Sequence, residues 1–142
     1  MNRLINLFKG TQGTFLGLIL LVAFFSIFNP YFFQIRNFVN IFDQCTVLGV
    51  MALGMTAVII IGGIDLSVGS ILALAMMMTG WVWKDFGVPL HYACLLGLFV
   101  GTLAGTINGM LVSYLRLPAF IATLAMLSAA RGLANIFTDG KQ

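Results

Sequence analysis

Gly62-Gly63-Ile64-Asp65-Leu66-Ser67-Val68-Gly69-Ser70 interrupts an apolar stretch that otherwise runs from Cys45 to Trp83. These nine residues place one carboxylate, two hydroxyls and three glycines among hydrophobic neighbours. An isolated acid in the interior of a bilayer is unfavourable unless it is solvated or paired. We therefore expect either a helix cap in a tight turn at the membrane edge or part of a polar route through a protein. Both interpretations require a membrane protein.

The composition supports a membrane protein. Hydrophobic residues make up 61% of the 142 positions and charged residues only 8%, and the mean hydropathy is +1.07. A soluble domain has roughly 25% charged residues, so this chain has too few to cover a surface in water. The net charge of +3 comes from basic residues that are scattered along the chain. They form no polybasic cluster of the kind that would predict binding to nucleic acid.

Hydropathy predicts an all-α, polytopic membrane protein with about five transmembrane helices. The expected spans are residues 13–28, 45–63, 66–83, 92–114 and 118–137. Residues 35–44 have helical periodicity with one polar face, which predicts a separate amphipathic helix at the membrane interface before the second span.

Three polar residues within apolar segments are candidates for contact with a transported solute: Asp65, Ser67 and Asn108. Asp65 or Ser67 would alternatively cap the third helix through a side-chain oxygen, with Gly62 and Gly63 ending the helix before it. Backbone that is irregular within a membrane must be buried in protein or line a wet cavity. A capping residue at the wall of a pathway would satisfy both interpretations. Packing and ligand contact both remain open for Asn108.

A glycine series predicts close helix packing in the fourth span. Gly97, Gly101, Gly105 and Gly109 are each four positions apart, so they form one slowly winding groove on a helix. Small residues at this spacing allow another helix to approach closely.

The chain lacks the residue patterns of common enzymes. Its single histidine, His91, excludes an HExxH motif, and no glutamate is present. No phosphate-binding GxxxxGK[ST] motif occurs, so ATP hydrolysis would need a separate subunit. Cys45 and Cys94 stand alone in apolar sequence. We expect no catalytic residue, metal or cofactor.

Three segments together resemble bacterial sugar-importer permeases of the ribose type, which belong to the ATP-binding-cassette transporters. They are Gly62–Ser70, the run Leu115–Leu124 followed by Arg131-Gly132-Leu133, and Asn29–Phe33 leading into Asn37–Ile41. The residues that carry the motifs are Gly63, Asp65, Leu66, Ser67, Gly69, Ser70, Pro118, Arg131 and Gly132.

This resemblance implies a multi-pass subunit of the bacterial inner membrane that imports a monosaccharide. It also implies a cytoplasmic ATPase subunit, a periplasmic sugar-binding protein and a second permease copy or paralogue as partners. Permeases of this type are about twice as long, so the resemblance implies the amino-terminal portion of one permease domain without its carboxy-terminal half. The alternative is a membrane assembly module, or a degenerate permease, that does not transport.

Overall fold

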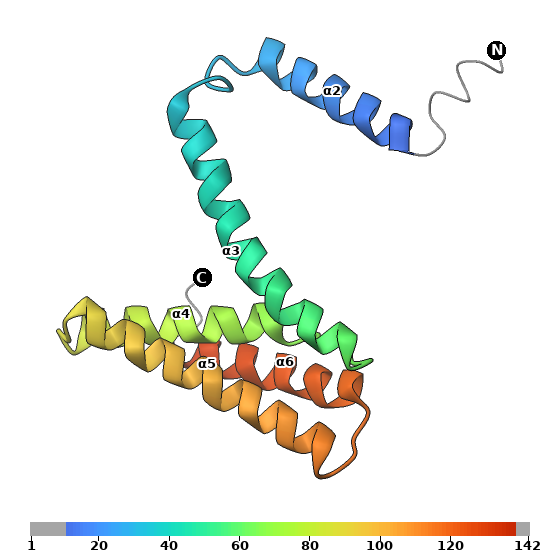
Figure 1. The fold of residues 1–142 in the computed structure, drawn as a ribbon. Helices are drawn as coiled ribbons and strands as arrows, with labels where there is room; N and C mark the ends of the chain where they lie inside the picture. Colours follow the sequence, from blue (N-terminus) through green and yellow to red (C-terminus); the bar gives the residue numbers. More distant parts are fainter. Residues whose placement is uncertain (1–10, 139–142) are drawn as a thin grey trace. The chain divides into compact units, whose positions relative to one another are not determined.

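The computed structural model describes residues 11–138, and its regular structure in this range is entirely helical. Five helices follow one another along the chain (Figure 1). They are α2 (Thr11–Phe28), α3 (Ile35–Ile60), α4 (Val68–Asp85), α5 (Leu90–Ser113) and α6 (Ala119–Phe137). The prediction of an all-α membrane fold is confirmed.

Three of the five helices, α3, α5 and α6, are long and apolar enough to cross a membrane. The apolar part of α2, Gly13–Phe28, is shorter. The remaining helix, α4, has 18 residues and carries Lys84 and Asp85 in its last turn. Five helices are therefore present as predicted, although two of them are weaker candidates for complete spans.

The prediction of a separate interfacial helix over residues 35–44 is wrong, because these residues form the first turns of the 26-residue helix α3. The polar face that predicted an interfacial helix includes Arg36, Asp43 and Gln44. Neither proline nor glycine occurs between Ile35 and Val47, so nothing in the backbone ends the helix before the apolar segment begins.

The chain divides after Gly49 into two compact units, and the boundary lies inside α3. In the first unit, α2 ends before Asn29-Pro30, where proline disfavours helical geometry at the preceding residue. The Asn29 side chain accepts a hydrogen bond from the Tyr31 N–H at 2.9 Å. Asn37 of α3 donates to the Phe32 carbonyl at 2.8 Å. These two bonds stabilise the turn that joins α2 to α3.

In the second unit, α4 is the central helix. It packs against both α5 and α6, which contact each other less (Figure 1). The buried apolar residues are mostly alanines, namely Ala93, Ala104, Ala122, Ala130 and Ala134, together with Leu74. Small side chains let helix backbones approach closely, which is typical of helix interfaces in membranes.

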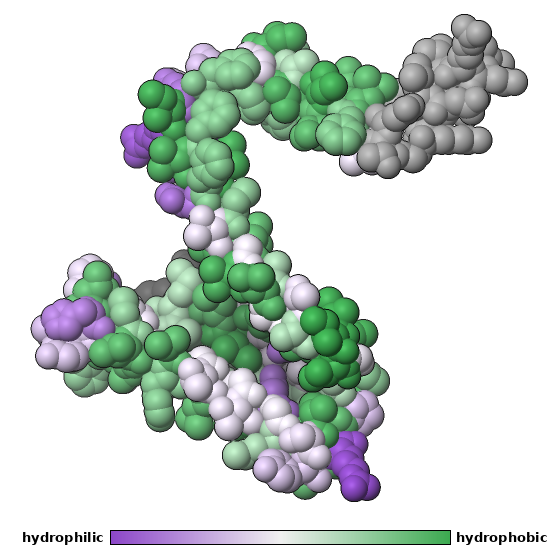
Figure 2. All heavy atoms as spheres, in the orientation of Figure 1, coloured by the Kyte–Doolittle hydropathy of each residue, from purple (hydrophilic) through white to green (hydrophobic). Residues whose placement is uncertain are grey.

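Apolar residues cover much of the visible surface of each unit (Figure 2), and many large apolar side chains are exposed. Examples are Ile19 in the first unit, 61% exposed, and Leu98 in the second, 69% exposed. Soluble monomers rarely expose contiguous apolar surface of this extent. The surface therefore suits lipid, as the composition predicts.

Candidate functional site

The site begins at the turn that ends α3. The Gly62 N–H bonds to the Ile59 carbonyl and the Gly63 N–H to the Val58 carbonyl, each at 2.9 Å. This paired pattern ends many helices and requires a residue with positive φ. Gly62 has a φ of 76°, which residues with a side chain adopt only with strain. Gly62 and Gly63 thus end the helix as predicted.

After this turn, Asp65 organises the entry into α4. One carboxylate oxygen, Oδ1, accepts hydrogen bonds from the Ser67 N–H at 2.7 Å and from the Ser67 hydroxyl at 2.6 Å. Ser67 is the residue before α4, but its side chain makes no capping bond to the helix. Of the two alternative caps, Ser67 is therefore the wrong one, because its hydroxyl oxygen accepts a hydrogen bond from the Asn108 side chain and none from a backbone N–H of α4. Asp65 acts one step earlier and fixes the conformation of Ser67 itself.

Ser67 links this turn to α5. Its side chain is completely buried, and its hydroxyl oxygen accepts a hydrogen bond from the Asn108 side-chain amide at 2.8 Å. Its backbone carbonyl accepts a bond from the buried Ser70 hydroxyl, also at 2.8 Å. The structure therefore joins the three predicted solute-contact residues, Asp65, Ser67 and Asn108, in one continuous hydrogen-bonded chain.

One polar atom in this series of hydrogen bonds has no hydrogen-bond partner among the described residues. Asn108 is only 6% exposed, and its carbonyl oxygen Oδ1 is buried without a hydrogen bond. A buried polar atom left unsatisfied costs about 1–3 kcal/mol. Such an atom in a native structure therefore calls for a physical or functional explanation.

Thr123 of α6 holds the same turn from the other side. It is 4% exposed, and its hydroxyl lies 3.2 Å from the Ile64 carbonyl and 2.8 Å from the Ala119 carbonyl. The sequence alone does not predict this role for Thr123. The available signal was a threonine inside the motif Leu115–Leu124, but a threonine in a helix usually bonds only within its own helix.

A cavity of about 770 Å³ opens beside the turn. Asp65, Asn108 and Thr123 all line it, and apolar residues such as Val58 and Met110 supply most of the remaining wall. A largely apolar cavity with a few convergent polar groups is the usual form of a small-molecule site. We therefore take this cavity as the candidate functional site.

The glycine series of α5 behaves differently at its two ends. A Cβ added to Gly97 would overlap the Thr79 hydroxyl and come within 2.9 Å of the Ala75 carbonyl, so only glycine fits against α4 there. At Gly101 the nearest neighbour, Ile71, would lie 3.9 Å away. Gly105 and Gly109 have no described atom that a Cβ would meet within 4 Å. Both line the cavity, so within the described chain they widen the site rather than pack a helix.

The remaining motif residues lie outside this cavity. Ser70 is buried in α4 behind the turn, and Leu66 is exposed. Pro118 directly precedes α6, and its carbonyl accepts hydrogen bonds from the first turn of that helix. Arg131 and Gly132 are exposed on α6. The structure therefore does not bring these residues to the cavity.

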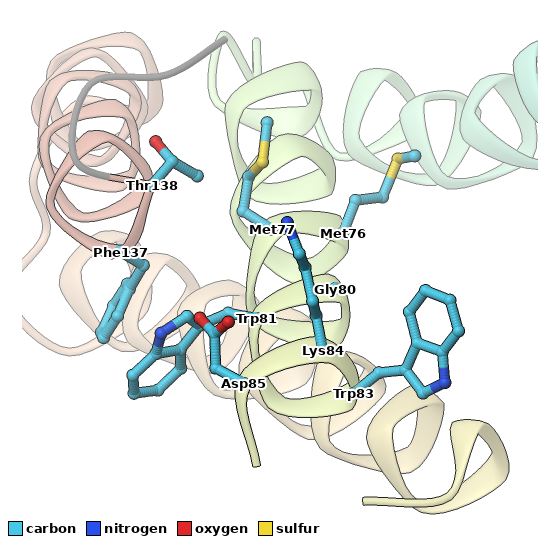
Figure 3. Close-up of a pocket in the computed structure, with 9 residues that line it drawn as sticks. All are labelled: Met76, Met77, Gly80, Trp81, Trp83, Lys84, Asp85, Phe137 and Thr138. Carbon is cyan, nitrogen blue, oxygen red and sulfur yellow. The ribbon is translucent and has the colours of Figure 1, made fainter. Parts of the chain in front are cut away.

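A second cavity, of about 490 Å³, lies between the carboxy-terminal ends of α4 and α6 (Figure 3). Trp81 and Phe137 lie side by side at its wall, with the two ring centroids 5.0 Å apart. Lys84 and Asp85, both exposed, complete one side. Aromatic and long charged side chains together are typical of a membrane interface. This cavity contains no buried, unpaired polar atom among the described residues, so it is the weaker candidate site.

A family model described as "Branched-chain amino acid transport system / permease component" matches residues 37–142. No solved structure matches the chain.

Several curated relatives also match. The ribose import permease protein RbsC of Haemophilus influenzae is 42% identical over 92% of the chain, and that of Bacillus subtilis is 44% identical over 90%. The autoinducer 2 import system permease protein LsrC of Yersinia pestis is 39% identical over 92%. The chain spans only 40%, 39% and 37% of these three proteins, respectively.

Proposed function

Because this chain belongs to the family of transport-system permease components, we propose that it forms part of a membrane-spanning subunit that imports a monosaccharide across the bacterial inner membrane. The observation that carries the proposal is the 42% identity to a ribose import permease over 92% of the chain. The apolar helices and exposed apolar surface support a place within the bilayer.

The substrate we propose follows the relatives rather than the description of the family model. That description refers to branched-chain amino acids, whereas the relatives named above are importers of ribose and autoinducer 2. The cavity supports a neutral solute, because the acid Asp65 is the one charged residue, and no basic residue is present, among the described residues that line it. An amino acid would bring a carboxylate as well as an ammonium group, and no described lining residue offers a positive charge to that carboxylate.

Within this function we propose that Asp65 and Asn108 form a polar wall of the solute pathway, and that Ser67, which is fully buried, joins them from behind. Their continuous hydrogen bonds and the cavity beside them support this role. Polar groups within membrane segments commonly mark substrate pathways, because placing them there without a function is unfavourable.

The proposal includes three partners: a cytoplasmic ATPase subunit, a periplasmic sugar-binding protein and a second permease subunit. The chain has no GxxxxGK[ST] motif, so the energy of ATP hydrolysis would come from another polypeptide. The permease itself would carry no catalytic residue.

A chimeric permease tests the function. Residues 1–142 would replace the matching segment of the Bacillus subtilis ribose import permease protein, in a strain that lacks its own copy but keeps the ATPase and the binding protein. We expect the chimera to restore uptake of radiolabelled ribose, and uptake to disappear when either partner gene is deleted. A chimera that reaches the membrane in normal amounts but transports nothing would favour the alternative, a membrane module without transport activity.

A further inference from the structure

The direction of the hydrogen bonds from α5 to the turn is determined by chemistry. The Asp65 carboxylate can only accept, so the Ser67 hydroxyl must donate its single hydrogen to it. The Ser67 oxygen is then left only as an acceptor. Asn108 must therefore present its NH₂ group to Ser67, as observed at 2.8 Å, and cannot rotate its amide by 180° without losing this bond.

This fixed orientation determines which atom of Asn108 remains free. With the NH₂ group on Ser67, the carbonyl oxygen Oδ1 is the atom without a partner. The residue belongs to the lining of the 770 Å³ cavity, although its side chain is more than nine-tenths buried and Oδ1 itself is covered in this conformation. A reversed amide would offer two N–H donors there instead of one acceptor.

We propose that Asn108 Oδ1 accepts a hydrogen bond from a hydroxyl group of the transported solute once side chains at the cavity wall move apart and uncover it, and that Asp65 and Ser67 are positioning residues that hold the amide in this orientation. This role rests on the proposed function, since it requires a hydroxylated solute in the cavity. A hydroxyl suits the site, because it supplies a donor without adding a negative charge near Asp65. A site built for a hydroxyl discriminates strongly against an analogue that lacks it, because the site's polar atom then stays unpaired.

The test measures binding of D-ribose to the 142-residue chain in lipid nanodiscs by saturation-transfer-difference NMR. Three deoxy analogues of ribose, each lacking a different hydroxyl, are titrated in parallel. We expect Asn108→Leu, which has a similar shape, to weaken ribose binding roughly tenfold, as the loss of one hydrogen bond predicts. The deoxy analogue that lacks the hydroxyl bound by Asn108 should bind to the wild type and to this variant with the same weak affinity.

Two further variants separate positioning from contact. In Asp65→Asn the new amide can donate as well as accept, so the direction of the hydrogen bonds through Ser67 is no longer determined and the Asn108 amide can reverse. We expect several-fold weaker ribose binding and reduced discrimination against the same analogue. Thr102→Val is the matched control. Thr102 lies on the same helix α5 but does not line the cavity, and its hydroxyl bonds only to the Leu98 carbonyl within that helix, at 2.8 Å. Its ribose binding should stay within twofold of the wild type.

A measurement on the wild type alone avoids any dependence on the folding of a variant. In the wild-type chain labelled with ¹⁵N-asparagine, the side-chain amide signal of Asn108 should shift as added ribose saturates the site. The signal should not shift when free leucine is added instead. Equal ribose binding by the wild type and Asn108→Leu would overturn the role of Asn108. So would a wild-type chain that neither binds ribose nor shows the shift, even if the chimeric permease transported ribose in cells.

Discussion

The side-chain amide of Asn108 donates a hydrogen bond to the hydroxyl of Ser67, 41 positions earlier in the chain, at 2.8 Å. Both side chains are buried, so this bond joins α5 to the break between α3 and α4 without competition from water. In a surrounding of low polarity such a bond is strong, and leaving either partner unpaired is unfavourable. The relationship makes the polar turn part of the helix packing as well as part of the cavity wall.

Ser67→Ala removes the group on which both neighbours depend. We expect the free energy of unfolding to fall by about 2–3 kcal/mol, because the buried Asn108 amide loses its partner. Titration with SDS in mixed micelles, followed by circular dichroism, measures this change. Ser113→Ala is the control, since its exposed hydroxyl bonds only within α5 and its loss should change stability by less than about 0.5 kcal/mol. Equal stability of the two variants would mean that the Ser67 bond contributes nothing.

Gly97 and Gly105 form a matched pair on the same helix. Gly97→Ala should destabilise the packing of α4 against α5 by about 1–3 kcal/mol, because the new methyl group overlaps Thr79 and crowds the backbone of α4. Gly105→Ala meets no described atom within 4 Å and should be neutral or stabilising by up to about 1 kcal/mol, since alanine favours the helix. The same unfolding titration compares them, and the reverse order of stability would contradict the helix contact described above.

Thr123→Val keeps the shape of the side chain but removes the hydroxyl near Ile64. We expect a loss of about 0.5–1.5 kcal/mol in the free energy of unfolding, and faster hydrogen exchange in the turn between α3 and α4. Thr123→Ser retains the hydroxyl and should restore slow exchange. Exchange in the turn that is as slow in the valine variant as in the wild type would show that α6 does not hold it.

The sequence predicted the helices where local chemistry determines their ends. Asn29-Pro30 ends α2, and the two glycines end α3. Pro118 directly precedes α6. At each of these positions a residue with restricted or unusual backbone geometry stops or starts a helix regardless of its surroundings.

The start of α3 could not be predicted in this way. Its first ten residues carry polar side chains that are typical of an interface, but hydropathy does not reveal whether the backbone continues into the next segment. The absence of a breaking residue after Gln44 was the better signal, because a helix continues until something ends it.

Residue type predicted Asp65, Ser67 and Asn108 as candidates, but it could not predict their connection. The register that places Asn108 against Ser67 depends on how α5 packs on α4, and the contact at Gly97 helps to set that register. The same limit explains why four evenly spaced glycines looked equivalent. Periodicity identifies one face of a helix, whereas the neighbouring helices decide which part of that face is covered.

Ribose uptake by the chimeric permease carrying Asp65→Asn tests the central claim most directly, namely that Asp65 orients a polar group on the solute pathway. The substitution changes the carboxylate to an amide of nearly the same shape, and the amount of protein in the membrane is measured alongside uptake. We predict that uptake falls at least roughly tenfold, the effect of about 1.4 kcal/mol, while the amount of membrane protein stays within a factor of two. Unchanged uptake at unchanged abundance would contradict the account.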